Sequence, residues 1–369
     1  MEFYTLFTRT ENTHLLKDVG MIPETMAAEF DDVDSYIVTY KNGDYPYIGN
    51  EIRHVKPVFL KKKFGRYIDG INFIRKNANR IDVLNIYHLN LSSYLYCLAA
   101  KKYLKKSAVI FLKLDLGPAE IAKVKKHDLR SFIKRRTIRL ADIVSGETTK
   151  LTGQLRDITG EDIRFITNGI YVPGSKAADP SRKKNKIITA GMLGTPPKNT
   201  GFLIDAFTTY AKNAQNGDWK LVLIGKCTCE IEQKVKETIN ADPSLKDRII
   251  LTGEITDKEQ LAKEYEEAKI FILPSKWESF GFVLPEALSF GDYLIVSGNV
   301  PLAEDLLYNE TAGRIIRDMS VETWAEEIAD VTRADIDWGK KCREDHDFVE
   351  NNYNWKIIVQ KILELIKEQ

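Results

Sequence analysis

The chain contains 369 residues, which is enough for two domains of ordinary size. Hydrophobic residues make up 43% of it and charged residues 29%, with 22 glycines and 12 prolines, so the composition excludes a disordered, collagen-like or coiled-coil chain. No apolar run approaches the roughly 20 residues that cross a bilayer, the start lacks a signal-peptide pattern, and the four cysteines form no zinc-binding set. We therefore expect a folded cytoplasmic protein.

Charge is unevenly distributed along the chain, although the net charge is only +1. Residues 1–172 carry 28 basic and 20 acidic groups, a balance of +8, and the remainder carries 26 and 33, a balance of −7. Residues 51–150 alone hold 23 basic and 8 acidic groups, a local +15. Such a surface attracts an anionic membrane or another polyanion, and solvated helix faces are an equally good interpretation.

Short apolar, β-branched segments alternate with longer helical stretches, which predicts a mainly parallel sheet in each half. In chain order the predicted strands are 3–8, 35–40, 83–88, 108–113, 143–145 and 163–166, then 186–190, 220–224, 248–252, 270–273 and 293–297. Residues 173–186 are rich in turn formers and charge and are predicted to be a linker. The pattern predicts an α/β chain with two Rossmann-like domains, residues 1–172 and 187–352, whose ligands bind at the carboxyl ends of the strands.

Residues 353–369 are predicted to end the chain in an amphipathic helix. Within 355–367, one helical face carries Ile357, Ile358, Ile362, Leu363 and Ile366. We expect this helix to pack back toward the N-terminal domain.

Residues 271–288 combine a buried strand, a loop and a helix start in a pattern suited to binding a diphosphate. Gly281 lets a ligand approach the backbone closely, and Pro285 suits the first turn of a helix. The free N–H groups of the loop and of this first turn carry partial positive charge. Glu278 and Glu286 supply acceptors for sugar hydroxyls on either side of it, although a single glutamate near a helix N-terminus is also common for stability alone.

This stretch resembles the Glu-x7-Glu signature of the retaining glycosyltransferases of family 4, which have the GT-B fold, two Rossmann-like domains facing each other across a cleft. Other similar positions are Gly191 with the turn around it, Lys198, Gly225, Gly253 and the segment Thr167-Asn168-Gly169-Ile170. The resemblance covers the C-terminal half closely and the N-terminal half more loosely. It implies transfer of a sugar from a nucleoside-diphosphate sugar with retention of anomeric configuration, without a required metal or a cofactor.

The resemblance also implies roles for individual residues on the donor side. Glu286 would bind the ribose hydroxyls and Glu278 the donor sugar, while Lys198 would neutralise the leaving diphosphate. The remaining donor-binding positions are Gly191, Lys226 and the backbone amides of Gly281, Phe282 and Val283. The family usually has an arginine beside the lysine, and this chain has Met192 there. Lys226 is expected to compensate for that arginine, or else to be an ordinary solvated loop lysine.

Two features of the first half are similar to the acceptor side of the family. Lys17, Asp18 and Gly20 fall in a predicted loop between the first strand and a helix beginning near Glu24, where contact with the acceptor or the diphosphate is implied. His88 ends a strand where the family often has a histidine beside the transferred sugar, so it is a candidate catalytic residue. Lys113 and Asp115 end the next strand, and their role is left open.

Taken together, these similarities predict a hexosyltransferase acting on a glycan or lipid-linked acceptor in capsule, O-antigen or related cell-surface polysaccharide synthesis. Residues 51–150 would bring it to the inner face of the cell membrane as a peripheral protein. The main alternative is a degenerate GT-B subunit that binds nucleotide without turnover, for which Met192 is the best support. An epimerase, a pyridoxal-phosphate phosphorylase and a nucleic-acid-binding protein are also considered, but no phosphorylase lysine motif and no nucleic-acid recognition motif is found.

Overall fold

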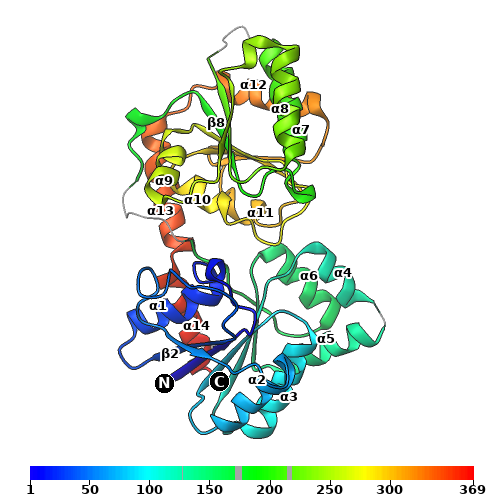
Figure 1. Cartoon of the computed structure of the whole chain (residues 1–369), viewed down its shortest axis with the longest axis vertical. Coiled ribbons are helices and arrows are strands. Elements are labelled where there is room, and N and C mark those ends of the chain that lie inside the picture. Colours follow the sequence, from blue (N-terminus) through cyan, green and yellow to red (C-terminus); the bar gives the residue numbers. More distant parts are fainter. Residues whose placement is uncertain (127, 171–176, 214–217) are drawn as a thin grey trace. The chain divides into compact units, whose positions relative to one another are not determined.

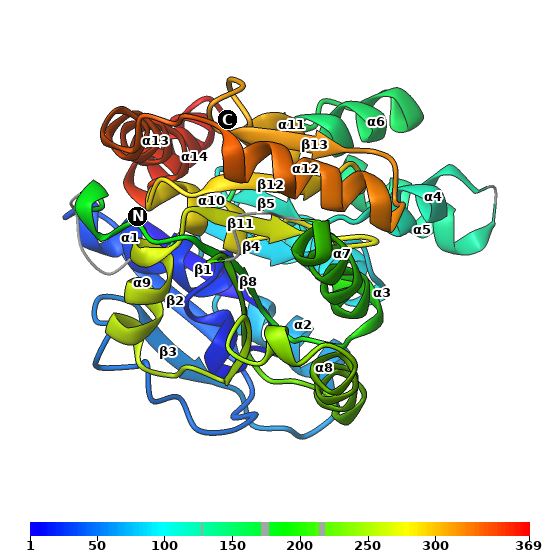
Figure 2. The same cartoon turned by 90° about the horizontal axis from the view of Figure 1, so that it is seen from above.

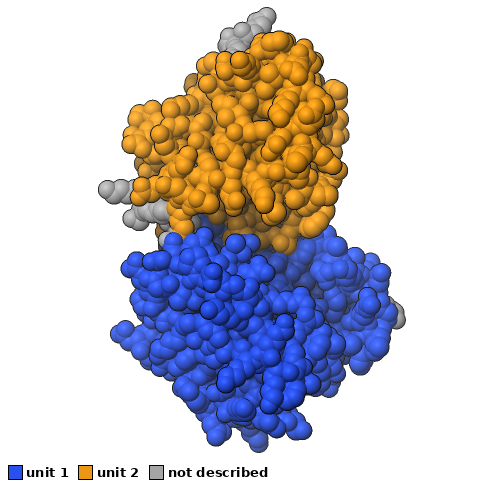
Figure 3. All heavy atoms as spheres, viewed as in Figure 1, with its two compact units in different colours: residues 1–171, 352–369 blue, residues 172–351 orange. Residues whose placement is uncertain are grey.

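The computed structural model describes residues 1–126, 128–170, 177–213 and 218–369. The chain divides into two compact units, unit 1 with Met1–Tyr171 and Asn352–Gln369, and unit 2 with Val172–Asn351 (Figure 3). Residues 173–176 of the predicted linker lie outside the described residues. Its later part is not an open connection, because it forms a short 3-10 helix, Pro180–Arg182, and the side chain of Lys183 is buried against Asp292 at 2.6 Å.

Unit 1 is built on a seven-stranded parallel sheet with the order β3-β2-β1-β4-β5-β6-β7. Its strands are β1 (Glu2–Leu6), β2 (Asp34–Thr39), β3 (Lys56–Phe59), β4 (Val83–Tyr87), β5 (Val109–Leu114), β6 (Ile143–Gly146) and β7 (Arg164–Phe165). The order reverses between β1 and β4, the usual place for a ligand in such sheets. Strand β3 escapes sequence prediction because it is a largely exposed edge strand without an apolar face.

Helices cover both faces of this sheet (Figure 1). One core packs the sheet against α2 (Arg66–Lys76), α3 (Leu91–Tyr103), α4 (Pro118–Lys125), α5 (Leu129–Leu140) and α6 (Thr149–Thr159). The other core packs it against α1 (Asp18–Glu29) and α14 (Trp355–Lys367), which contact each other. The end of the chain therefore returns to unit 1, where Ile358, Ile362 and Ile366 of α14 are buried.

Helix α1 begins at Asp18, six residues before the position predicted from the sequence. The prediction of a loop carrying Lys17, Asp18 and Gly20 is wrong for the last two, which are helical, while Lys17 is the N-cap residue. Gly20 and Pro23 suggested a loop, because both disfavour the interior of a helix. Burial of every residue from Asp18 to Met26 outweighs those propensities.

Unit 2 has a six-stranded parallel sheet with the order β10-β9-β8-β11-β12-β13. Its strands are β8 (Lys186–Ala190), β9 (Lys220–Ile224), β10 (Ile249–Gly253), β11 (Ile270–Leu273), β12 (Tyr293–Ser297) and β13 (Gly313–Ile316). One face packs against α7 (Thr200–Asn213), α8 (Cys229–Ala241) and α12 (Val321–Arg333), and Figure 2 shows α12 beside α7. The remaining helices are α9 (Lys258–Glu267), α10 (Val283–Ser289), α11 (Ala303–Leu306) and α13 (Trp338–Tyr353). Two parallel-sheet Rossmann-like domains confirm the predicted fold class.

Candidate active site

Three glycines follow one another along the carboxyl edge of the unit 2 sheet, at the ends of β8, β9 and β10. Gly191, Gly225 and Gly253 all have positive φ, at 140°, 129° and 71°. The N–H of Gly225 donates to the carbonyl of Gly253 at 2.9 Å, and a Cβ at position 225 would overlap the carbonyl oxygen of Gly191. This edge consequently exposes backbone rather than side chains, which suits the close approach of a ligand.

Lys198 and Glu278, the two predicted catalytic residues of unit 2, form an ion pair beside these glycines. Lys198 Nζ lies 2.7 Å from Glu278 Oε1, and both side chains are mostly shielded from solvent. The same carboxylate oxygen accepts a hydrogen bond from Ser275 Oγ at 2.7 Å. A Cβ on Gly191 would contact Lys198 Cε at 3.3 Å, so the glycine turn leaves room for the lysine. The sequence separates the two charges by 80 positions, and the fold brings them together.

Glu286 is held in place by a buried tyrosine that the sequence analysis missed. Tyr265 Oη of α9 donates to Glu286 Oε2 at 3.3 Å. The Tyr265 ring is stacked on Phe271 and Phe290, with centroids 6.0 and 5.6 Å away. Burial and the neighbouring Glu286 raise the pKa of Tyr265 well above its usual value, so it remains a hydrogen-bond donor. No spacing rule connects a tyrosine on one helix with a glutamate on the next, which is why only the structure reveals this pair.

The loop between Glu278 and Glu286 is compact. Gly281 has a φ of 96°, and its carbonyl accepts the N–H of Leu284 at 2.9 Å just where α10 begins. Phe282 and Val283 are half-buried, with the Phe282 ring 4.9 Å from that of Phe280. The predicted donor-binding amides thus belong to one tightly folded turn.

Met192 and Lys226 lie on the two loops that follow β8 and β9. Met192 is 63% exposed, an unusual state for this side chain, and Lys226 is also exposed. The loops are joined by hydrogen bonds from Leu193 N–H to the Lys226 carbonyl at 2.9 Å and from Thr228 N–H to the Leu193 carbonyl at 3.2 Å. Lys226 therefore belongs to the same carboxyl edge as Gly191.

The carboxyl edge of the unit 1 sheet is polar and buried. Lys113 at the end of β5 is fully buried with its Nζ 3.3 Å from Glu147 Oε1, and Asn168 Nδ2 donates to the same oxygen at 2.8 Å. Burial raises the pKa of Glu147 to about 8, with Lys113 opposing the shift and Asp115 and Asp18 adding to it. The pKa of Asp18 is also raised by burial. Glu147 and Asn168 were missed as a pair because they follow two different strands.

His88 adjoins this group with a strained backbone. Its φ of 65° is one of two positive values among the described non-glycine residues, and its N–H donates to the Lys113 carbonyl at 3.1 Å. The imidazole contacts the Phe7 ring edge-on at 5.4 Å and lines a cavity of about 210 Å3 with Arg66 and Asn90. Strain in a residue at a cavity is typical of functional positions.

Gly20 is explained by packing, because a Cβ there would overlap the backbone of Leu15. Asp18 lies close to the buried Lys113 and Glu147. Its backbone carbonyl accepts a hydrogen bond from the hydroxyl of Tyr87 at 3.0 Å. Lys17 is exposed at the start of α1. Of the three predicted acceptor-side residues, only Asp18 adjoins the polar edge of unit 1.

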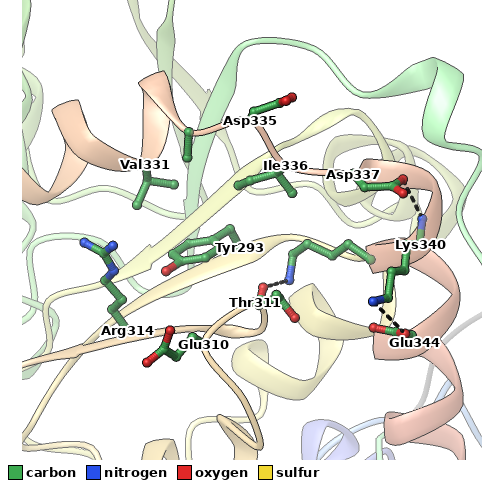
Figure 4. A pocket seen from close by; sticks show the side chains of 12 residues that line it. Tyr293, Glu310, Thr311, Arg314, Val331, Asp335, Ile336, Asp337, Lys340 and Glu344 are labelled. Carbon is green, nitrogen blue, oxygen red and sulfur yellow. Dashed lines mark hydrogen bonds and ion pairs between the residues drawn. The ribbon is translucent and has the colours of Figure 1, made fainter.

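Another hollow in unit 2 lies at the opposite edge of its sheet. A cavity of about 590 Å3 is lined by Tyr293 and Arg314 near the starts of β12 and β13, with Lys340 and Glu344 of α13 (Figure 4). Its buried Lys341 donates to the Thr311 carbonyl at 2.6 Å. None of the predicted site residues lines this cavity.

Within the described ranges, no group of three or more His, Cys, Asp or Glu side chains is arranged to hold a metal ion. In the same ranges no helix is long and apolar enough to cross a membrane.

A family model and several known proteins match the second half or about half of the chain. Residues 184–333 match the family model described as Glycosyl transferases group 1. The chain is 26% identical over 206 residues to a GDP-mannose:cellobiosyl-diphosphopolyprenol alpha-mannosyltransferase of Xanthomonas oryzae pv. oryzae, covering 55% of this chain and 52% of that protein. It is 27% identical over 215 residues to a UDP-Gal:alpha-D-GlcNAc-diphosphoundecaprenol alpha-1,3-galactosyltransferase of Escherichia coli, covering 55% and 53%. The chain thus spans about half the length of the curated relatives it matches.

Solved structures resemble the whole chain in fold. Sucrose-phosphate synthase from Thermosynechococcus elongatus superposes with a TM-score of 0.75 at 17% identity, covering 100% of this chain and 98% of that one. Anabaena HepE in complex with UDP and glucose gives 0.72 at 15% identity, covering 100% of both chains. These likenesses establish the architecture. Residues 184–333 match the model of the glycosyl transferases group 1 family, and the chain as a whole has the GT-B fold.

Proposed function

We propose that this protein transfers a sugar from a nucleoside-diphosphate sugar to a glycan or lipid-linked acceptor. The observation that carries the proposal is the Lys198–Glu278 ion pair beside the glycine turns at the carboxyl edge of unit 2. It lies inside the segment that matches the glycosyltransferase family model. A cation, bare backbone and a carboxylate at one strand edge are the groups that an activated sugar requires.

Each group has a proposed role in the transfer. Glu286, oriented by Tyr265, binds the ribose hydroxyls, and Glu278 binds hydroxyls of the donor sugar. The amides of Gly281, Phe282 and Val283, together with the turn at Gly191, contact the sugar and the diphosphate. Lys198 neutralises the charge that develops on the leaving diphosphate, and Lys226 supplies a second positive charge where Met192 supplies none.

We further propose that the anomeric configuration is retained and that no metal is required. In this scheme the leaving phosphate itself helps to remove the proton of the acceptor hydroxyl, so the protein contributes positioning and electrostatic stabilisation. His88 stands at the switch point of the unit 1 sheet and is the proposed contact beside the transferred sugar. A covalent intermediate and a pair of opposed carboxylates are not needed.

The acceptor is proposed to be lipid-linked, with cell-surface polysaccharide as the product. The names of the two transferases described above both include a diphosphate-linked polyprenol. Unit 1 contains 31 basic and 22 acidic residues, a net charge of +9. This positive charge supports peripheral association with the inner face of the cell membrane.

A panel of UDP- and GDP-sugars with a water-soluble, diphosphate-linked acceptor tests this function. The expected result is release of nucleoside diphosphate that depends on the acceptor, with an α-linked product from an α-linked donor. Glu278→Gln is expected to lose most of the turnover, while the exposed Glu237→Gln on α8 retains it. Full turnover in Glu278→Gln would remove this carboxylate from the mechanism.

A nucleotide-binding subunit without turnover is the second candidate, favoured by the exposed Met192 at the position of the family's arginine. Calorimetry with UDP and GDP separates the two candidates. Nucleotide binding with no turnover of any donor would favour the subunit, and turnover would exclude it.

A further inference from the structure

Exposed apolar side chains are concentrated on unit 1. Among the described residues, eleven large hydrophobic side chains are exposed, and eight of them belong to this unit. The two most exposed of these eight are Leu129 at 74% and Phe132 at 62%. They stand three positions apart in the first turns of α5, so they share one face of that helix.

This face is surrounded by positive charge. Residues 118–139, which form α4, α5 and their connection, contain eight basic and two acidic residues, a local +6. Glu120 is already paired with Lys123 and with Lys134, the latter at 2.6 Å. Asp128 is engaged as the N-cap of α5, where it accepts the N–H of Ser131 at 2.7 Å. The two acidic residues therefore have partners inside the hairpin.

Three further cations are exposed around the apolar pair. Lys126, Arg130 and Arg136 are exposed, and no ion pair of theirs is found within the described ranges. Long basic side chains can extend past a buried apolar group and keep their charge at a polar interface. Leu129 and Phe132 with these three cations define what we call the α5 surface.

Helix α5, which carries most of the α5 surface, lies at one side of unit 1, where it packs against α4 and α3 (Figures 1 and 2). The buried side of α5 is formed by Ser131, Thr137 and Ile138. The helix is thus attached to the core by one face and presents the apolar pair on another.

We propose that the α5 surface docks on an anionic lipid bilayer, with Leu129 and Phe132 in the interfacial layer and Lys126, Arg130 and Arg136 against the lipid headgroups. A leucine and a phenylalanine surrounded by cations match an interface that is apolar below and anionic above. The phosphates of a nucleic acid would bind the cations, but a nucleic acid would leave Leu129 without an apolar partner. The choice of a bilayer rests on the proposed function in one respect, namely that the proposed acceptor is lipid-linked.

Flotation with two kinds of vesicle tests the proposal, one of phosphatidylcholine alone and one with 30% phosphatidylglycerol. The intact chain is expected to float with the anionic vesicles and to bind the neutral ones at least about tenfold more weakly. The double variant Leu129→Ser/Phe132→Ser is expected to lose binding by at least about tenfold. The double variant Arg130→Gln/Arg136→Gln should lose it by a similar factor. Phe165→Ser on edge strand β7, a 41% exposed aromatic of the same unit, is the control and should float like the intact chain.

Several results would overturn the proposal. The intact chain could bind both kinds of vesicle equally, or bind neither. Alternatively, only the arginine variant could lose vesicle binding, which would mean that charge attracts the protein to the bilayer without insertion of Leu129 and Phe132. Thermal melting of each variant checks that it is folded, and both α5 positions are exposed enough to tolerate serine. Turnover on a water-soluble acceptor should persist in Leu129→Ser/Phe132→Ser. If neither the intact protein nor the variants turn over that acceptor, the proposed function fails, but the flotation result still stands.

Discussion

The two units share an architecture and differ in what occupies the carboxyl edge of the sheet. In unit 2 the edge consists of glycine turns with one partly shielded ion pair, Lys198–Glu278. In unit 1 it consists of buried ionisable groups, among them Lys113 and Glu147. The surrounding charge also differs, since unit 1 carries +9 and unit 2, with 23 basic and 31 acidic residues, carries −8. The same fold therefore offers backbone donors at the carboxyl edge of the unit 2 sheet and polar side chains at that of the unit 1 sheet.

The largest effect is expected from replacing the buried lysine at the polar edge of unit 1. Lys113→Met should lower the free energy of unfolding by about 3–5 kcal/mol at pH 8.5, because Glu147 loses its buried counterion and must either keep an unpaired charge or take up a proton. Urea titration measures the change. Lys101→Met, which breaks the solvent-exposed pair with Asp142, is the control and should cost less than about 1 kcal/mol. Equal losses in the two variants would mean that burial of the pair is unimportant.

The same edge should make stability depend on pH. The pKa of Glu147 is about 8 in the folded chain against an ordinary value of 4.5, so the folded state holds this proton over a range where the unfolded state has lost it. The contribution of this group is therefore complete at low pH and falls as pH rises from about 4.5 to about 8. The penalty of Lys113→Met should accordingly shrink at pH 5.5, where Glu147 is protonated. A penalty that is larger at pH 5.5 than at pH 8.5 would contradict the raised pKa.

The ion pair of unit 2 should matter for turnover rather than for stability. Lys198→Met is expected to lower kcat by about 100- to 1,000-fold, because the leaving diphosphate loses a cation in the transition state. Steady-state kinetics with the best donor measure the change. Lys184→Met, which removes a 61% exposed lysine paired with Glu267, is the control and should retain kcat. A Lys198→Met enzyme that changes only KM would assign Lys198 to uniform donor binding.

The glycine turns of unit 2 can be tested by adding one methyl group. Gly225→Ala should destabilise the protein by about 1–3 kcal/mol and weaken nucleotide binding, since the new Cβ overlaps the Gly191 carbonyl. Thermal melting with and without nucleotide separates the two effects. Gly43→Ala in unit 1, where no atom lies within 4 Å of the new Cβ, should leave both quantities nearly unchanged.

The smallest expected effect concerns the orientation of Glu286. Tyr265→Phe removes its hydrogen bond to that carboxylate and should raise the donor KM by about fivefold, in line with about 1 kcal/mol for one bond. The control Tyr308→Phe removes a 2.7 Å bond to Asp345 in the same unit and should leave KM unchanged. If both variants shift KM alike, Tyr265 has no special role in positioning Glu286.

Local pattern was enough to predict most of the architecture. Apolar β-branched segments marked the strands except β3 and β13, and the 3.6-residue spacing of Ile358, Ile362 and Ile366 marked α14. These elements are predictable because their periodicity directly reflects the face that they bury. Glu278, Gly281 and Glu286 were found together because nine consecutive positions, in the loop after β11 and the first turn of α10, carry them.

The start of α1, the pairing of Lys198 with Glu278 and of Tyr265 with Glu286, and the burial of Lys113 against Glu147 were decided by tertiary structure alone. In each pair the partners are distant along the chain or lie on different elements, so that no local spacing records their contact. In α1, burial of consecutive residues outweighs the propensities of Gly20 and Pro23. The sequence thus determined which elements form and which loop carries the donor-binding motif. Long-range packing determined which charges meet, because only a closed core fixes their distances and removes them from water.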